Sequence, residues 1–265
     1  MIKKTILLLS SLALFSCAPN SPEEEGPQSI SFSLDLLEEN MQQDSLLQMR
    51  FHIEDLIIDS SYASSESLEK KIRQRLLANN SNSEGDYRNY ADLIDKMKEE
   101  YRTLNQENEM AQSWELVQNI AVVLNENGLF GLQSNHFSYT GGAHGNTFIA
   151  NQTYRLDNAN LLSLDSLLIP EEKPTFIALC ESKFRQGQEI AAQESLEAHG
   201  FWFEKDSFQI PDNFGYSPQG LSLIYNSYEI APYAFGIIKI NLSPAEIAPF
   251  IKPEYILSTK KEAAM

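Results

Sequence analysis

The sequence predicts an α+β protein in which antiparallel sheets pack with helices in two closely joined subdomains. Residues 30–36 and 47–53 alternate apolar and mostly polar side chains, the period-two pattern of half-buried strands, so we expect these two segments to pair. Further along the chain, apolar residues recur every three or four positions, as they do on a helix with one buried face. Turns that contain glycine, proline and asparagine separate these segments.

Two helices are expected after the first strand pair. One is centred on residues 68–76, and a longer one follows Asp86, which is placed to cap it. The longer helix carries an apolar face rich in tyrosine, formed by Tyr87, Tyr90, Ile94, Met97, Tyr101 and Leu104. Tyrosines at helical spacing pack in a core more often than they form a ligand platform, so we expect this face to be buried.

A hairpin and a glycine loop follow the helices. Residues 114–124 and 129–139 are predicted strands, joined by a tight turn at Asn127 and Gly128. The next segment, 140–146, reads TGGAHGN and leads into a strand over 148–156. Three glycines in five residues indicate a backbone that needs positive φ or the close approach of another segment, which favours a tight turn.

The rest of the chain repeats this mixture of elements. Residues 174–198 are predicted to be helical, and SPQG at 217–220 has the proline and glycine of a type I turn before a strand at 221–225. A last strand is expected over 237–240. It is followed by a helix that Ser243 and Glu246 open with a capping box.

These patterns divide the chain into five parts. An N-terminal export segment and a tether precede two α+β subdomains and a short tail. The expected bounds are 1–16 for the signal peptide, 17–29 for the tether, 30–138 for the first subdomain, 139–257 for the second and 258–265 for the tail.

The first residues have the pattern of a secretory signal. Lys3 and Lys4 precede an apolar run over 5–15, which is too short to span a membrane. The run ends in Leu14, Phe15, Ser16 and Cys17, a sequence that resembles the lipobox of bacterial lipoproteins. This resemblance implies a lipid on Cys17 as the membrane attachment. An ordinary cleaved signal with a cysteine at its boundary is the alternative.

The segment after Cys17 is predicted to be a flexible acidic tether. Residues 18–29 read APNSPEEEGPQS and lack apolar periodicity. Ala18 after the cysteine resembles the signal for the outer membrane, and Glu23–Glu25 resembles the acidic export tags of some surface lipoproteins. We therefore expect a protein of the cell envelope, at the outer membrane, on its periplasmic or surface face. A solvated acidic linker is the simpler alternative for the three glutamates.

Charge and cysteine content limit the possible partners. The net charge of −17 argues against nucleic acid and anionic membrane surfaces, because binding phosphate requires clusters of Lys and Arg. Attraction to a basic protein is allowed. Apart from Cys17 the chain has only Cys180, so no intramolecular disulfide is expected once Cys17 is acylated. Cys180 shares helical spacing with Phe176 and Phe184, which favours burial as a small apolar side chain.

No catalytic constellation stands out, so we expect no enzyme, no metal and no cofactor. The chain has no G-x-S-x-G elbow, and its histidines do not have the spacing of a zinc site. The histidines are His52, His136, His144 and His199. His144 differs from the others because its loop is glycine-rich. A histidine that bonds the backbone to hold a turn is nevertheless more common than a catalytic base at such a place.

Three segments together resemble a known family. They are YTGGAHGN from Tyr139, LSLDSLL from Leu162, and YEIAPYAFG from Tyr228. The set resembles the extracytoplasmic C-terminal domain of RsiV-type lysozyme-sensing anti-sigma factors and of PdaC-type peptidoglycan deacetylases, preceded by its usual companion domain. The resemblance implies an α+β fold and an envelope role, without implying catalysis. The resemblance also implies a set of candidate residues for a ligand-binding or structural loop. They are Tyr139, Gly141, Gly142, His144, Asn146, Tyr228, Glu229 and Tyr233.

The same resemblance suggests a function. The chain shows neither the sigma-binding and transmembrane segments of those anti-sigma factors nor a deacetylase metal site, so we expect the sensing or binding module alone, carried on a lipid. Its partner would be a lysozyme-like basic protein or the cell-wall glycan. The alternatives are an enzyme or accessory module of peptidoglycan metabolism and a structural envelope lipoprotein.

Overall fold

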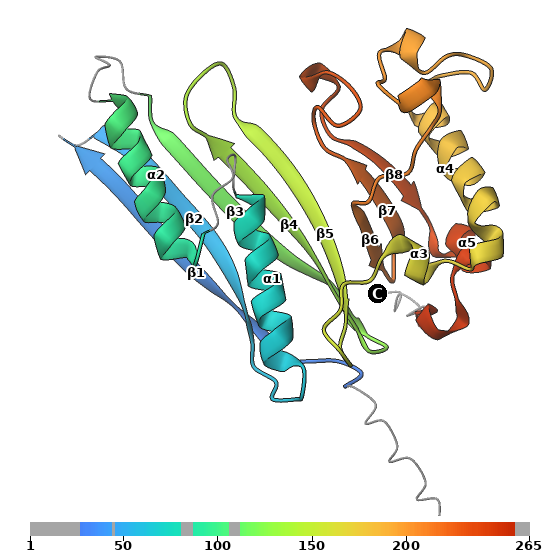
Figure 1. Ribbon diagram of the computed structural model, residues 1–265, viewed down its shortest axis with the longest axis horizontal. Coiled ribbons are helices and arrows are strands. Elements are labelled where there is room, and N and C mark those ends of the chain that lie inside the picture. Colours follow the sequence, from blue (N-terminus) through green and yellow to red (C-terminus); the bar gives the residue numbers. More distant parts are fainter. Residues whose placement is uncertain (1–26, 44–45, 81–86, 106–111, 258–265) are drawn as a thin grey trace, which may run out of the picture.

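The computed structural model describes residues 27–43, 46–80, 87–105 and 112–257 (Figure 1). The predicted signal peptide, Cys17, most of the tether, the predicted cap Asp86 and the tail lie outside the described residues. Within the described ranges, no helix combines the length and the apolar character needed to cross a membrane. The class is α+β, as predicted, with one five-stranded and one three-stranded sheet.

The larger sheet contains the first five strands in sequence order. The predicted strand pair is confirmed, since the first two strands run antiparallel, and the hairpin turn has positive φ at both Asn127 and Gly128. One pair departs from the expected antiparallel pattern, because β2 and β3 are parallel. The strands are β1 (Phe32–Gln43), β2 (Leu46–Ile58), β3 (Trp114–Glu126), β4 (Leu129–Tyr139) and β5 (Asn146–Arg155).

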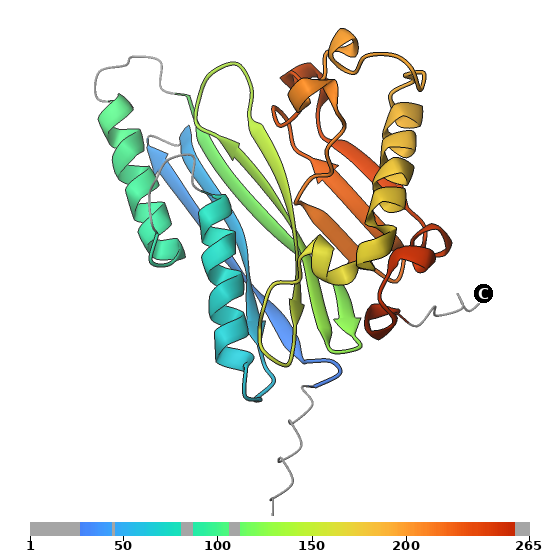
Figure 2. The same ribbon diagram turned by 45° about the vertical axis from the view of Figure 1, so that its right-hand side comes forward.

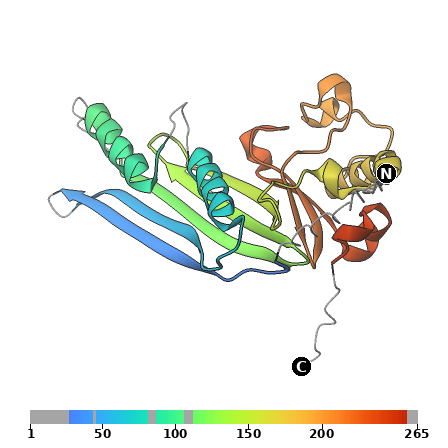
Figure 3. The ribbon, with the colours of Figure 1, turned by 60° about the horizontal axis from the view of Figure 1, so that its bottom comes forward.

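Two helices supply the crossover that the parallel pair requires. The helices α1 (Ser65–Asn79) and α2 (Tyr90–Asn105) lie together on one face of the larger sheet, as Figure 3 shows. Tyr90 and Tyr101 are buried there, so this part of the predicted tyrosine face packs in the core. Leu104 is 54% exposed near the end of α2 and does not. Just before α2, Asn89 Oδ1 accepts from the Asp92 backbone N–H and caps the start of the helix.

The smaller sheet has its own core. Its strands are β6 (Phe214–Ser217), β7 (Gly220–Tyr225) and β8 (Ile238–Leu242), all antiparallel. They pack with α4 (Lys173–Gly187), visible beside the sheet in Figure 2, and with the short helices α3 (Leu164–Leu167) and α5 (Pro244–Ile247). The predicted capping box at Ser243 and Glu246 is present. Cys180 is buried among phenylalanines, and burial raises the pKa of its thiol to about 12.

Two predicted boundaries differ from the structure. The helix expected over 174–198 ends at Gly187, because Glu189 takes a φ of 57° and the chain leaves the helix axis. The guanidinium of Arg185 then donates to the carbonyls of Ala191 and Glu194, which fixes the following turns. The subdomain boundary expected at 138/139 falls inside the larger sheet, because β5 pairs with β4 up to Arg155.

The two sheets meet at the outer edge of β5. The side chains of Asn213 and Asn226 bond the free backbone groups of this strand. Asn226 Oδ1 accepts from Ile149 N at 2.8 Å and Asn213 Oδ1 accepts from Asn151 N at 2.9 Å, while both Nδ2 groups donate to Ile149 O. Next to this contact, a Cβ on Gly215 would lie 2.9 Å from Asn151 Oδ1, so a larger residue there would require the Asn151 side chain to move.

The start of the described chain lies at the opposite end of β4 from the glycine loop. Gly128 N donates to Gln28 O at 3.0 Å, beside the turn where β4 begins. Tyr139, at the other end of β4, leads into the loop of residues 140–145. An eleven-residue strand therefore separates the two places.

A polar network is buried between the larger sheet and α1. Gln118 accepts from Asn80 at 2.6 Å and donates to Tyr90 at 2.9 Å. His136 Nδ1 contacts Asn80 Oδ1 at 3.1 Å, and His136 Nε2 contacts Ser134 Oγ at 2.8 Å. A proton on Nδ1 satisfies Asn80 while Nε2 accepts from the serine hydroxyl, so the neutral ring fits both partners. Burial lowers the pKa of His136 from 6.5 to about 4.

We expect His136 to make stability depend on pH between about 4 and 6.5. In this range the unfolded chain takes up a proton that the folded chain does not, so the free energy of unfolding falls as the pH is lowered, by up to about 3 kcal/mol at 1.36 kcal/mol per pKa unit. Urea unfolding at several pH values, on the full chain and on His136→Gln, measures the difference. Equal slopes for the two proteins over this range would contradict the assignment.

Candidate functional site

Two loops that are far apart in the sequence meet at one end of the molecule. Residues 140–145 connect β4 to β5, and residues 226–237 connect β7 to β8. Asn226 holds the second loop against β5 at Ile149, just after the first loop ends. The candidate residues predicted from the sequence are all within or next to these two loops.

Stacked rings join the loops. The ring centroids of His144 and Tyr233 are 3.9 Å apart with an interplanar angle of 13°, and Tyr228 lies 5.6 Å from Tyr233. The carbonyl of Gly145 accepts from the Tyr233 hydroxyl at 3.1 Å and lies 3.0 Å from His144 Nδ1. His144 thus contacts the backbone of its own turn and a ring of the other loop. These contacts give His144 a structural role.

The glycines have the conformation that the sequence predicts. Gly141 and Gly142 have φ values of 96° and 94°. Gln112 Oε1 accepts from Gly142 N at 2.8 Å and from the hydroxyl of Tyr139, also at 2.8 Å, so the segment just before β3 braces the turn. The side chain of Asn146 is exposed at the first position of β5.

A third segment adds aromatic rings that sequence reasoning missed. Trp202 N donates to Ile230 O at 2.8 Å, which places residues 197–206 beside the second loop. Trp202 is 54% exposed, Tyr228 55% and Phe235 42%, values well above those of ordinary core aromatics. We call the set His144, Trp202, Tyr228, Tyr233 and Phe235 the loop surface. Neither Trp202 nor Phe235 belongs to a periodic pattern that could have identified it.

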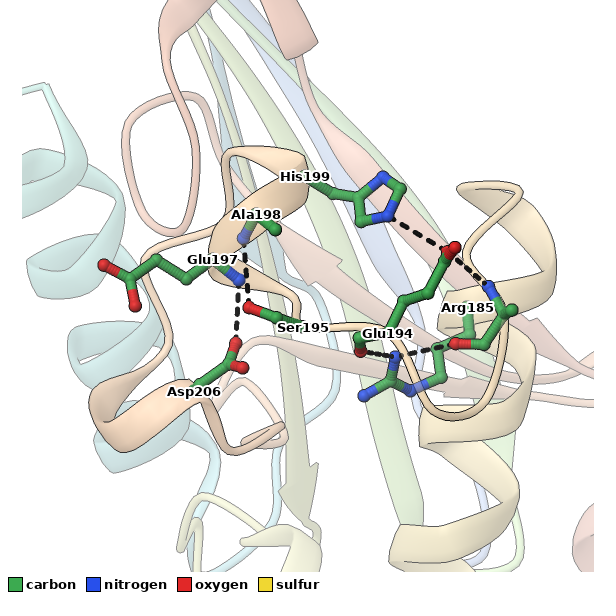
Figure 4. A network of polar contacts seen from close by, with 8 residues as sticks. Arg185, Glu194, Ser195, Glu197, Ala198, His199 and Asp206 are labelled. Carbon is green, nitrogen blue, oxygen red and sulfur yellow. Dashed lines mark hydrogen bonds and ion pairs between the residues drawn. The ribbon is translucent and has the colours of Figure 1, made fainter.

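Polar contacts fix the segment that carries Trp202, as Figure 4 shows. Asp206 Oδ1 accepts from Glu197 N at 2.7 Å, and this bond is the first of the contacts that lower the pKa of Asp206. Glu194 Oε2 accepts from Ala191 N and contacts His199 Nε2, both at 3.1 Å. The segment is therefore held in place even though much of it is irregular.

Exposed acidic side chains lie on two of the three segments. They are Glu197, Glu204 and Glu229, beside the exposed Lys205. Glu189 and Glu194 are exposed just before the segment that carries Trp202. Asn226 Nδ2 donates to Glu229 Oε1 at 3.2 Å, so this carboxylate is held at the start of the second loop.

The histidines do not form a common site. His136 is buried in the sheet, His144 is stacked on Tyr233, and His199 contacts Glu194. His52 contacts Glu38 on the neighbouring strand. In the described part of the chain, no group of three or more His, Cys, Asp or Glu side chains is placed to hold a metal ion.

Two segments of the chain match known protein families. Residues 54–147 match the family model of deacetylase PdaC, and residues 165–243 match DUF3298, a family of unknown function. A curated relative, the peptidoglycan-N-acetylmuramic acid deacetylase PdaC of Bacillus subtilis, is 26% identical over 149 residues. That alignment covers 55% of this chain and 29% of the enzyme, so the similarity extends over less than a third of the relative's length.

Solved structures share the fold. A DUF3298 family protein from Bacteroides fragilis has a TM-score of 0.62, and one from Pseudomonas aeruginosa has a TM-score of 0.57. Each is 18% identical, and the superpositions cover 87% and 88% of this chain and 97% of each neighbour. The family matches confirm the PdaC part of the predicted resemblance and add a DUF3298 domain, and these two domains suggest a cell-wall-related module.

We expect the turn to require glycine at position 142. A Cβ on Gly142 would meet nothing within 4 Å, but its φ of 94° strains any β-branched residue, so Gly142→Val should lower the free energy of unfolding by about 1–3 kcal/mol. The control is Gly187→Ala, because Gly187 also has open space but lies in α4 with ordinary φ. That change should be neutral or stabilise by up to about 1 kcal/mol in urea unfolding. Wild-type stability of Gly142→Val would refute the strain argument.

Proposed function

We propose that this chain is a lipid-anchored, non-enzymatic binding protein of the cell envelope whose loop surface recognises a basic, lysozyme-like protein. The carrying observation is that exposed aromatic rings and exposed carboxylates occur together on residues 197–206 and 226–237. Trp and Tyr provide much contact area and dominate the energy of protein interfaces. Surrounding carboxylates give such an interface selectivity for a cationic partner.

The net charge and the similarity to known families support the same partner. The net charge of −17 steers a basic protein toward the chain over long range. The matches to PdaC and DUF3298 support a cell-wall setting, and the resemblance to lysozyme-sensing domains supports a lysozyme-like ligand. A structural role for His144 and the burial of Cys180 support a protein that binds without catalysis.

A cell-wall glycan is the second candidate. Exposed Trp202 and Tyr228 could stack against sugar rings, and the curated relative is by its name a peptidoglycan enzyme. The exposed carboxylates of Glu197, Glu204 and Glu229 favour the basic protein over an anionic glycan, because like charges repel at an interface.

The loop surface should bind hen-type lysozyme and lose this binding when its rings are removed. We expect a dissociation constant on the order of 10 µM at physiological salt, weakened at least about tenfold by Trp202→Ser or Tyr228→Ser. Leu36→Ser is the matched control, since Leu36 is 53% exposed on β1, outside the loop surface. Calorimetry at about 0.05, 0.15 and 0.5 M NaCl separates a packed interface from charge steering, which salt screens.

Cytochrome c serves as an equally basic decoy in the same titrations. Specific recognition requires that lysozyme binds more tightly than cytochrome c at every salt concentration. Equal affinity for both proteins, or an unaltered affinity in both serine variants, would reject lysozyme as the ligand of this surface.

The lipid anchor is tested at Cys17. Replacing the thiol removes the acylation site, so Cys17→Ala should yield a protein that carries no diacylglycerol and accumulates as a precursor of higher mass. Mass spectrometry of the purified chain and radiolabelled palmitate incorporation measure this. Normal processing of Cys17→Ala, together with retention in the membrane fraction, would show that the attachment lies elsewhere.

A further inference from the structure

A second cleft lies away from the loop surface, over the face of β5 that α1 covers. It has a volume of about 430 Å³, within the range of small-molecule sites. Its walls come from α1, from β5 and from the segments before α3 and β6, and α3 itself lies at the junction of the two sheets (Figure 2). The residues that matter here are Arg75, Asn79, Phe148, Gln152, Leu161 and Asp212.

Several polar groups of the cleft already have partners. The amide of Asn213 makes hydrogen bonds with the backbone of β5. The amide of Asn151 donates to Asn213 Oδ1 at 3.1 Å and accepts from Gln133. Ser163 caps α3 by accepting from Ser166 N. These groups form the walls of the cleft, and their hydrogen bonds within the protein make them poor ligand contacts.

Two of the residues that line the cleft carry a buried amide donor that has no partner among the described residues. Gln152 is only 3% exposed, and its Nε2 makes no hydrogen bond; the same is true of Asn79 Nδ2. A hydrogen bond from Tyr154, two residues further along β5, fixes the orientation of the Gln152 amide. Burial raises the pKa of Tyr154 to about 12, so its phenol keeps its proton and donates to Gln152 Oε1 at 2.7 Å. A buried donor without an acceptor costs about 1–3 kcal/mol, which a ligand that supplies an acceptor would recover.

A cation and apolar side chains complete the cleft. Arg75 is exposed and forms no ion pair within the described ranges. Phe148 is half-buried and Leu161 is 39% exposed, so apolar surface borders the donors. Asp212 is exposed on the opposite segment and can accept from a ligand N–H.

We propose that this cleft is a binding site for the carboxylate end of a short peptide or N-acylated amino acid. The guanidinium of Arg75 takes the carboxylate, the amides of Gln152 and Asn79 donate to its oxygens or to the neighbouring carbonyl, and Asp212 accepts from the peptide N–H. The apolar walls contact the hydrocarbon part. One arginine suits a single planar carboxylate, whereas a dianionic phosphate would meet only this one cation in a protein of charge −17.

The test uses the full chain solubilised in detergent and three probes. N-acetyl-alanyl-alanine carries the carboxylate, its C-terminal amide lacks it, and inorganic phosphate is an anion of different shape. Binding is followed by calorimetry and by the side-chain amide resonances of Gln152. We expect a dissociation constant at or below about 1 mM for the acid, and at least about tenfold weaker binding of the amide and of phosphate.

Variants separate this cleft from general charge effects. Arg75→Gln should weaken binding of the acid at least about tenfold. The melting temperature should not change, because Arg75 lies on the exposed side of α1. Arg102→Gln, an exposed arginine on α2, is the matched control and should keep wild-type affinity. Gln152→Met removes the buried donor at similar volume and should also weaken binding.

Binding of the acid to the cleft is tested independently of lysozyme binding to the loop surface. Tyr228→Ser should leave the affinity for the acid unchanged, so failure here and failure of lysozyme binding can be told apart. Equal affinity for the acid and its amide, tighter binding of phosphate, or loss of binding in Arg102→Gln as large as in Arg75→Gln would overturn the proposal. No binding of the acid at about 5 mM would overturn it as well.

Discussion

The pairing of the outer edge of β5 by two asparagine side chains is the contact on which the arrangement of this protein depends. An edge strand exposes unpaired N–H and C=O groups, and proteins commonly cover such edges. Here Asn213 and Asn226 take the place of a sixth strand, since both bond the backbone of Ile149 and Asn213 also bonds Asn151. The smaller sheet is therefore fixed against the larger one without joining it.

Both candidate sites follow from this edge contact. Asn226 starts the loop that carries Tyr228 and Tyr233, so its bond to Ile149 brings that loop beside His144. Asn213 follows Asp212, and its bonds to β5 close one wall of the cleft that contains Gln152. Because a buried amide must satisfy both its oxygen and its nitrogen, the contact has little freedom to shift.

Local chemistry made much of the fold predictable. The alternation in β1 and β2, the positive φ at Asn127 and Gly128, and the capping box at Ser243 each depend on residues close in sequence. The parallel pairing of β2 with β3 depends on a long crossover and could not be inferred from periodicity. The cleft was missed for the same reason, since Arg75, Gln152 and Asp212 come from three separate segments. Family resemblance located the loops, but the contribution of Trp202 required the structure.

The opposite placement of Gln28 and the glycine loop along β4 has a geometric consequence. At about 3.3 Å per residue, the strand holds the loop surface roughly 35 Å from the point where the chain enters the fold. A chain of the length of residues 18–29 spans at most about 40 Å when fully extended. With the proposed lipid on Cys17, this tether and β4 together would limit how far the loop surface can lie from the bilayer.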